Sequence, residues 1–281
     1  MKNLVLNNKV EMPILGFGVY QMNNSEECEQ SVLTALETGY RLIDTAAAYQ
    51  NETEVGNAVR KSGISREEIF ITSKLWIQDA GYEKTLAAFE KTLNNLQTDY
   101  LDLYLIHQPF GDVFGAWQAM QELYYQGKIK AIGISNFQPD HVMDFIVNSK
   151  FTPAVNQIET HPFHQQIKTQ EFLKTNKVQI QSWASFAEGR NNLFQNEVLA
   201  SIGKQYNKSV AQVVLRWLIQ RNIAVIPKSI TKSRIQENFD VFDFELSQND
   251  MIQIASLDTK DSLFFDHRNP EMVKSLSNYN F

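Results

Sequence analysis

The chain has 281 residues, of which 43% are hydrophobic and 21% are charged. A chain of this length and composition buries a full core, which excludes a disordered protein, a collagen-like protein and a disulfide-stapled miniprotein. Its 26 basic and 32 acidic residues give a net charge of −6, which disfavours a nucleic-acid partner because binding to DNA needs a positive face.

Cys28 is the only cysteine, so we expect no intrachain disulfide and no cysteine-based zinc cluster. The first residues contain one lysine and a short apolar run broken by asparagines, which is unlike a signal peptide. No apolar run reaches the length of about 18 residues that spans a membrane. We therefore expect a cytoplasmic protein in a reducing compartment, without a membrane partner.

The predicted elements begin with a hairpin over residues 4–10, turned at Asn7 and Asn8 because asparagine tolerates the positive φ angle of a tight turn. This hairpin could close one end of a barrel. Eight short apolar runs that favour β-strands follow, at residues 14–19, 41–44, 69–73, 100–106, 129–134, 154–158, 178–183 and 224–226. Stretches with helical spacing separate them, such as Leu86, Phe89, Leu93 and Leu96.

Strands that alternate with helices form parallel βαβ units. Eight such units in 281 residues predict a (β/α)8 TIM barrel, with a doubly wound sheet as the alternative. No linker or change in composition divides the chain, so we expect one domain over residues 1–281. Residues 258–281 show no helical period in their first half, and we expect this segment to lie over the barrel as a loop.

Four polar residues are candidates for catalysis, because the active site of such a barrel lies at the C-terminal ends of its strands. Asp44 ends the second predicted strand, Lys74 and His107 follow the third and fourth, and Tyr49 lies in the loop after Asp44. A nearby ammonium lowers the pKa of a tyrosine. Lys74 would thus tune Tyr49, Asp44 would keep Lys74 protonated, and His107 would bind a carbonyl oxygen. Any one of these residues is more often a cap or an ion-pair partner, but the four together predict a proton-donating site.

The chain has no G-x-G-x-x-G sequence, so a Rossmann nucleotide site is not expected. Lys228, Ser229 and Arg234 instead cluster around the last predicted strand and the start of a short helix. Backbone N–H groups and cations at such a place can hold a phosphate. His161 and His164 have no third ligand nearby in the sequence, so we interpret them as structural and expect no metal.

Several stretches resemble the aldo-keto reductase family: LGFGV at 15–19, GYRLIDTA at 39–46 with the following Tyr49, Glu52 and Gly56, TSKLW at 72–76, DYLDLYLIH at 99–107, GISNF at 133–137, and IPKS at 226–229 with Arg234, Glu237 and Asn238. The resemblance covers about the whole chain. It is strongest to short bacterial members, the 2,5-diketo-gluconate and glyoxal reductases. It implies a TIM barrel, active as a monomer, that reduces aldehydes or ketones with NADPH through the tetrad Asp44, Tyr49, Lys74 and His107.

The resemblance also implies how the cofactor would be held. Lys228, Ser229 and Arg234 would bind the 2′-phosphate of NADPH, with Asn238 near the adenine. The nicotinamide would be bound by Ser135, Asn136, Gln157 and the ring of Trp183. Many family members have a proline where this chain has Ser185, which leaves the conformation of residues 187–192 open.

Five aromatic residues would form an apolar substrate mouth, although each could equally be ordinary packing: Tyr20, Trp76, Phe110, Phe264 and Phe265. Residues 263–281 would close this mouth over a small-molecule carbonyl substrate. Two other functions remain open. One is a barrel that binds NADPH without turnover, and the other is a lyase in which Lys74 forms a Schiff base.

Overall fold

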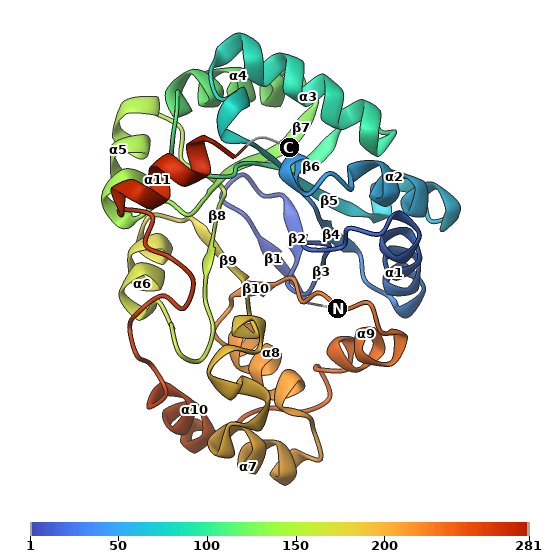
Figure 1. Ribbon diagram of the computed structural model, residues 1–281, viewed down its shortest axis with the longest axis vertical. Helices are drawn as coiled ribbons and strands as arrows, with labels where there is room; N and C mark the ends of the chain where they lie inside the picture. The colour runs from blue at the N-terminus through green and yellow to red at the C-terminus, as the bar shows by residue number, and fades with distance from the viewer. Residues whose placement is uncertain (1, 280–281) are drawn as a thin grey trace.

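The computed structural model describes residues 2–279. Its centre is a sheet of eight parallel strands in the order β10-β9-β8-β7-β6-β5-β4-β3 (Figure 1). The strands are β3 (Phe17–Gly18), β4 (Leu42–Asp44), β5 (Phe70–Leu75), β6 (Leu101–Ile106), β7 (Ile129–Ser135), β8 (Val155–Glu159), β9 (Gln179–Trp183) and β10 (Ala224–Val225). All eight predicted strands are confirmed, although the first and last are shorter than predicted.

The sheet closes on itself between its first and last strands. The Gly16 backbone N–H donates to the Val225 carbonyl at 2.8 Å, and that of Gly18 donates to the Pro227 carbonyl at 3.2 Å. Glycine is needed at position 18, because a Cβ there would lie 2.7 Å from the Ile226 carbonyl oxygen. Closure makes the fold a (β/α)8 TIM barrel, so the alternative of an open doubly wound sheet is wrong.

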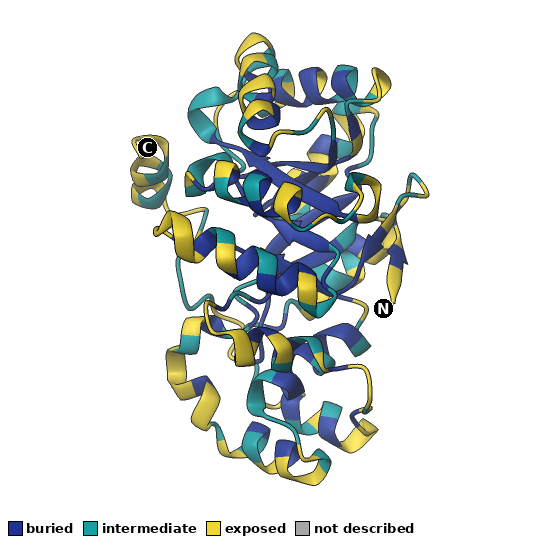
Figure 2. Cartoon of the chain, turned by 90° about the vertical axis from the view of Figure 1, so that its right-hand side faces the viewer, coloured by how far each residue is buried: buried dark blue, intermediate teal, exposed yellow. Residues whose placement is uncertain are grey.

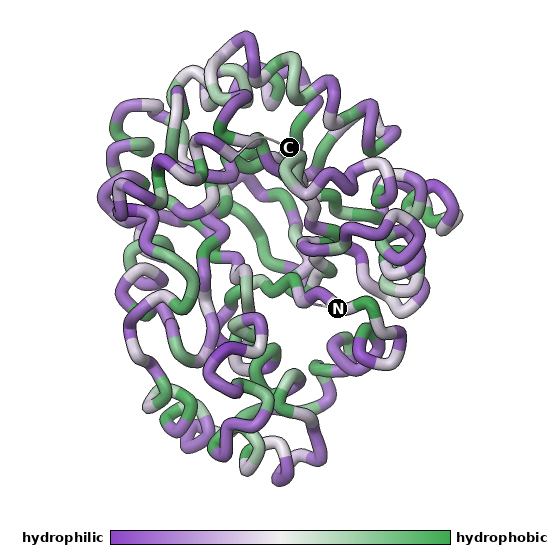
Figure 3. The backbone as a smooth tube through the Cα atoms, in the orientation of Figure 1, coloured by the Kyte–Doolittle hydropathy of each residue, from purple (hydrophilic) through white to green (hydrophobic). Residues whose placement is uncertain are grey.

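Helices surround the barrel: α1 (Ser25–Thr38), α2 (Glu52–Lys61), α3 (Tyr82–Leu96), α4 (Val113–Tyr125), α5 (Pro139–Ser149), α6 (Ile167–Thr175), α7 (Glu197–Tyr206), α8 (Val210–Gln220), α9 (Lys232–Phe239), α10 (Gln248–Ala255) and α11 (Pro270–Ser277). Short 3₁₀ turns lie between them: η1 (Ala47–Tyr49), η2 (Arg66–Glu68), η3 (Ile77–Asp79) and η4 (Ala187–Gln195). The strands of the barrel are buried almost throughout, whereas most of the helices bury one face and expose the other (Figure 2). Figure 3 colours the backbone by hydropathy, and apolar segments, in green, lie in the barrel strands and alternate with polar ones along the helices.

The N-terminal hairpin consists of β1 (Asn3–Val5) and β2 (Glu11–Pro13), paired antiparallel. The expectation that an asparagine supplies the positive φ angle is wrong, because Lys9 carries it at 71°. Asn7 and Asn8 instead tie the hairpin to the barrel, donating to the carbonyls of Pro153 at 3.0 Å and Lys130 at 2.8 Å. Both carbonyls lie at the N-terminal ends of strands, so the hairpin covers the end of the barrel opposite the tetrad.

The C-terminal segment is only partly the expected loop. Residues 258–269 are irregular, but Pro270–Ser277 form α11, which begins at Pro270 after an Asn269 side chain that accepts a hydrogen bond from the Glu271 N–H. Asparagine followed by proline is a strong helix start, which explains why a helix forms here in place of the expected loop. The indole of Trp76 donates to the Tyr279 carbonyl at 3.0 Å, which holds the segment over the barrel. Met1, Asn280 and Phe281 lie outside the described residues. No described helix is long and apolar enough to cross a membrane.

Candidate active site

The four predicted catalytic residues meet at the C-terminal ends of adjacent strands. Asp44 ends β4, Lys74 lies in β5 one residue before its end, and His107 directly follows β6. Tyr49 ends the η1 turn that follows β4. The parallel pairing of β4, β5 and β6 brings these side chains together.

Lys74 is at the centre of this group and is completely buried. Its Nζ lies 2.5 Å from Asp44 Oδ1, 2.9 Å from the Thr45 carbonyl oxygen and 3.2 Å from the Tyr49 hydroxyl. An ammonium has three N–H donors, and each of the three therefore has an acceptor. Burial alone would lower the pKa of Lys74, but Asp44 and Tyr49 outweigh it and raise that pKa, so the amine stays protonated.

The position of Lys74 determines what Tyr49 can do. The Tyr49 oxygen accepts a hydrogen bond from the ammonium, so its own proton remains available to another acceptor. The expected net lowering of the Tyr49 pKa is wrong. Burial raises this pKa, and the Lys74 charge only partly offsets the rise. Tyr49 is consequently a protonated phenol at neutral pH, while Lys74 stabilises the phenolate that would follow loss of the proton.

His107 lies beside Tyr49, with the two rings 5.6 Å apart in an edge-on arrangement. Trp76 also lies edge-on to His107, at a ring distance of 5.1 Å. Burial, followed by the charges of Lys74 and His267, holds the pKa of His107 well below its usual value. The imidazole is therefore neutral at pH 7 and can donate one hydrogen bond to a carbonyl oxygen.

A cavity of about 580 Å³ opens at the tetrad. Asp44, Tyr49 and His107 line it, whereas Lys74 is covered by them. Four of the five predicted mouth residues also line it: Tyr20, Trp76, Phe264 and Phe265. Phe110 does not line it, and its ring instead faces His267 at 6.3 Å. The cavity is also lined by Gln108 and Glu188, which the sequence analysis does not single out, and by Leu276 and Tyr279. Leu276 and Tyr279 lie in residues 263–281, the segment expected over the mouth, although no local pattern marks them individually. Gln108 could have been found because it directly follows His107.

Polar side chains from β7, β8 and β9 form one wall of the same cavity. The Asn136 amide donates to the His107 carbonyl at 3.1 Å, and its oxygen accepts from the Trp183 indole at 2.8 Å. Gln157 donates to Asp44 Oδ2 at 2.8 Å and to Gln181 Oε1 at 2.9 Å. Ser135 donates to the Gln157 carbonyl at 2.8 Å. Asn136, Gln157 and Ser135 all line the cavity, as does the half-buried ring of Trp183.

The predicted phosphate-binding residues lie at the β10 side of the cavity. Lys228 lines it and is half-buried. Ser229 and Asn238 are buried and Arg234 is exposed on the first turn of α9, and none of these three lines the cavity. The first turn of α9 offers free backbone N–H groups next to these cations, which is a suitable place for a phosphate.

The loop after Trp183 has an unusual backbone. Ala184, Ala187, Glu188, Asn191 and Asn192 all have φ angles between 50° and 52°. Ser185, at the position of the family proline, is buried, and its hydroxyl lies 2.8 Å from that of Ser182. This serine pair ties the loop to β9.

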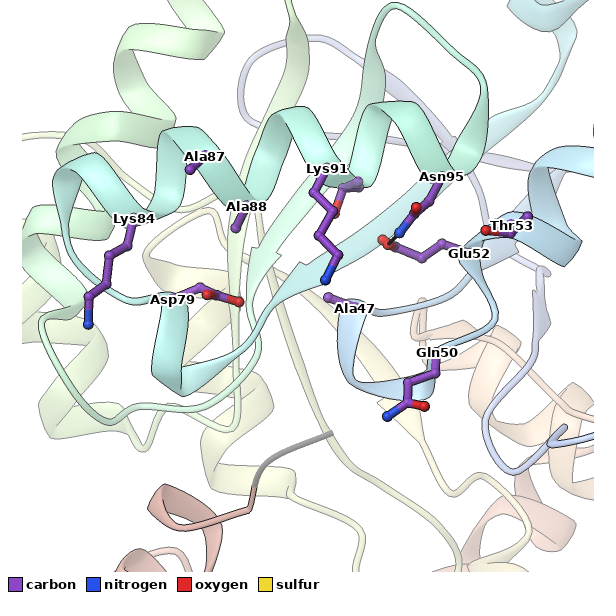
Figure 4. A pocket seen from close by; sticks show the side chains of 11 residues that line it. Ala47, Gln50, Glu52, Thr53, Asp79, Lys84, Ala87, Ala88, Lys91 and Asn95 are labelled. Atoms are coloured by element: carbon purple, nitrogen blue, oxygen red, sulfur yellow. Dashed lines mark hydrogen bonds between the residues drawn. The ribbon is translucent and has the colours of Figure 1, made fainter.

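Figure 4 shows a second cavity, of about 590 Å³. The η1 turn contributes to both, since Ala47 lines the second cavity and Tyr49 lines the first. Within it the buried Glu52 accepts hydrogen bonds from Ser73 at 2.6 Å and Asn95 at 3.1 Å. None of the tetrad residues lines this second cavity, so we assign the chemistry to the first.

None of the four histidines outside the tetrad lines its cavity. His161 is buried, with Nε2 2.9 Å from Glu159 and Nδ1 accepting from backbone N–H groups. His164 is half-buried and His141 is exposed. Within residues 2–279 there is no group of three or more His, Cys, Asp or Glu side chains arranged to hold a metal ion.

Comparison with known proteins identifies the family of this barrel. The model of the "Aldo/keto reductase family" matches residues 14–259. The chain belongs to the aldo/keto reductase family. It is 51% identical to the glyoxal reductase of Bacillus subtilis (strain 168) over 253 residues, which cover 90% of this chain and 91% of that protein. It is 45% identical to the methylglyoxal reductase DkgA of Escherichia coli (strain K12) over 250 residues, 88% of this chain and 90% of that protein.

A solved structure of this family is also similar. The Bombyx mori aldo-keto reductase in complex with NADP has a TM-score of 0.90 and 31% sequence identity, covering 97% of this chain and 96% of that one. The resemblance to aldo-keto reductases found in the sequence is thus confirmed, as is the barrel. As a member of this family, the chain is an oxidoreductase.

Proposed function

We propose that this protein reduces aldehydes or ketones to alcohols with NADPH, and that Tyr49 donates the proton. The observation that carries this proposal is the bond from Lys74 to the Tyr49 oxygen at 3.2 Å. It leaves the phenol proton directed to another acceptor, and it places a fixed positive charge where the phenolate forms.

Each tetrad residue has a role in this reaction. Tyr49 transfers its O–H proton to the carbonyl oxygen as a C–H bond forms at the carbonyl carbon. Lys74 then stabilises the phenolate through its ammonium, and Asp44 keeps Lys74 protonated and oriented at 2.5 Å. His107, neutral in its buried position, donates a hydrogen bond to the same carbonyl oxygen and orients it towards Tyr49.

The cavity wall that contains Ser135, Asn136 and Gln157 suits a nicotinamide. A carboxamide has both an N–H₂ group and a carbonyl oxygen, and Ser135, Asn136 and Gln157 offer hydroxyl and amide groups of both kinds along the cavity. Trp183 adds a flat ring beside them. The bound cofactor would supply the hydride. Lys228 and Arg234 would hold its 2′-phosphate, and Asn238 would lie near the adenine.

The substrate class follows from the size and walls of the cavity. Aromatic rings from Tyr20, Trp76, Phe264 and Phe265 surround the tetrad, so apolar and aromatic aldehydes fit. The names of the two bacterial relatives add glyoxal and methylglyoxal, both small 1,2-dicarbonyls, to the substrates we propose for this chain.

The alternative of a Schiff-base lyase is disfavoured by the state of Lys74. A nucleophilic amine must be unprotonated and reachable, whereas Lys74 is completely buried, has an acceptor for each N–H, and has a raised pKa. A barrel that binds NADPH without turnover is disfavoured by the tetrad itself, since a binding protein needs no free phenol proton.

The proposal is tested by mixing the purified protein with NADPH and following the nicotinamide absorbance with a small aldehyde, an aromatic aldehyde and a 1,2-dicarbonyl. We expect consumption of NADPH only when a carbonyl compound is present, with one alcohol formed per NADPH. NADH serves as the matched cofactor control and is expected to react more slowly. No consumption with any carbonyl class would refute the proposal.

A further inference from the structure

A buried carboxylate that has no part in the proposed reaction binds the C-terminal segment where it passes the substrate mouth. Glu159 ends β8 and is only 5% exposed. Its Oε2 accepts a hydrogen bond from the Ser262 hydroxyl at 2.6 Å, and its Oε1 accepts one from the Leu263 N–H at 2.9 Å. These bonds join positions about a hundred residues apart, directly before the two phenylalanines of the mouth.

His161 orients this carboxylate. The Nδ1 atom of His161 accepts hydrogen bonds from the backbone N–H groups of Phe163 at 3.2 Å and His164 at 3.1 Å, so it carries no proton. The ring proton therefore lies on Nε2, which donates to Glu159 Oε1 at 2.9 Å. Burial alone would raise the pKa of Glu159, but the bonds from His161, Ser262 and Leu263 lower it overall, so the group remains a carboxylate at neutral pH.

Ser262 connects Glu159 to the backbone of the two phenylalanines at the mouth. While its hydroxyl donates to Glu159, the same oxygen accepts the backbone N–H of Phe264 at 3.0 Å and that of Phe265 at 3.1 Å. A serine hydroxyl has one donor and two lone pairs, so all of its capacity is used. The orientation of the two N–H groups thus depends on Glu159 accepting the serine proton.

The two rings that follow line the cavity at the tetrad. Phe264 lies against Trp183 at a ring distance of 5.2 Å and under the Arg190 guanidinium at 4.1 Å. Phe265 is stacked with Trp183 at 6.5 Å. A change in the backbone at residues 264–265 would therefore move the wall that contacts a large substrate.

We propose that Glu159 is a positioning residue for substrate selection, which fixes Phe264 and Phe265 at the mouth through Ser262 and is itself oriented by His161. This inference rests on the proposed carbonyl reduction only for its kinetic test. It assigns a role to His161, whose side chain has no place in the reaction, and it explains why a carboxylate is buried at the end of β8.

The test compares Glu159→Gln and Ser262→Ala with the wild type. The glutamine has nearly the same size, but a carboxamide has only one acceptor oxygen. If its N–H₂ group faces Ser262, it cannot accept the serine proton, and if it faces the other way, it meets the N–H groups of Leu263 and His161, so one side loses its acceptor in either orientation. We call the hydrogen bonds of Ser262 to Glu159, Phe264 and Phe265 the relay. Ser262→Ala removes these bonds without changing a residue of β8, so it decides the question if Glu159→Gln does not fold. Asp261→Asn is the matched control, because it removes an exposed carboxylate next to Ser262 and none of the relay bonds.

We expect both relay variants to raise the KM for an aromatic aldehyde about tenfold, as for the loss of one hydrogen bond to a charged group. The kcat for that substrate, and both constants for a small aliphatic aldehyde, should stay within about twofold of the wild type. Equal losses for both substrates would overturn the proposal and indicate a general structural role. In a Phe264→Ala/Phe265→Ala background, Glu159→Gln should have no further effect on the aromatic aldehyde, and a further tenfold loss there would also overturn it.

Amide hydrogen exchange provides a readout that needs no reductase activity. The N–H groups of Phe264 and Phe265 are bonded to Ser262, so their exchange should become faster in Glu159→Gln than in Asp261→Asn. Unchanged exchange would refute the positioning role even if the protein reduces carbonyls. Faster exchange in a protein that reduces no carbonyl would instead leave the positioning role standing and refute the proposed function.

Discussion

Replacing Tyr49 with phenylalanine removes a single hydroxyl and tests the proposed proton donor directly. The loss of a positioned general acid lowers the rate by about 10²–10⁴-fold, or roughly 3–5 kcal/mol of transition-state stabilisation. The cavity keeps its shape, because the ring contacts with Tyr20 at 5.0 Å and His107 at 5.6 Å do not involve the hydroxyl. We therefore expect kcat to fall and the affinity for NADPH to stay the same.

The same substitution has a small and calculable effect on stability. Lys74 loses the acceptor at 3.2 Å but keeps Asp44 and the Thr45 carbonyl. One unsatisfied buried donor costs about 1–3 kcal/mol. For 281 residues, the unfolding entropy of about 2.1 cal/mol/K per residue converts this cost to a fall in Tm of roughly 2–5 °C.

The assay measures NADPH oxidation at saturating aldehyde, NADPH binding by fluorescence titration, and Tm. Tyr40→Phe is the matched control, because Tyr40 is completely buried and its hydroxyl donates to the Ile235 carbonyl at 3.1 Å, away from the cavity. It should show a similar fall in Tm with turnover within about twofold of the wild type. Turnover of Tyr49→Phe within tenfold of the wild type would refute the role of Tyr49 as the proton donor.

Three further predictions follow from the same geometry. Arg234→Ala should weaken NADPH about tenfold more than NADH in fluorescence titrations, because only NADPH carries the 2′-phosphate, and equal weakening would contradict the phosphate assignment. Lys74→Met and Asp44→Asn should each lower kcat, and the double variant should lose far less than the product of the two losses; independent effects would instead multiply. Burial lowers the pKa of His267 from 6.5 to about 4, against smaller opposing effects of Glu159 and Asp266, so the unfolded chain binds the proton first. The free energy of unfolding should then be greatest above pH 6.5 and fall by up to about 3 kcal/mol towards pH 4. Urea unfolding between these pH values should show a smaller fall in His267→Phe, and the same fall in the variant would exclude a contribution from His267.

The local pattern of the sequence determined the elements of the barrel and the place of its active site. Apolar runs of strand length alternate with helical spacing, and this periodicity depends only on which residues are neighbours along the chain. The ends of those runs located Asp44, Lys74 and His107, because parallel strands present their C-terminal ends at one face. The start of α11 at Asn269 and Pro270 is also a local signal, since both residues favour the first positions of a helix.

Tertiary structure alone decided the properties that depend on burial and on distant contacts. The sequence suggested that Lys74 lowers the pKa of Tyr49, but burial of the phenol outweighs the effect of the Lys74 charge, so the net direction is upward. The bond from Ser262 to Glu159 spans 103 positions, and neither residue has a local pattern that indicates the other. The periodicity of apolar residues indicates which face of an element is buried. Desolvation and long-range hydrogen bonds, by contrast, arise only when the barrel closes and brings distant side chains together.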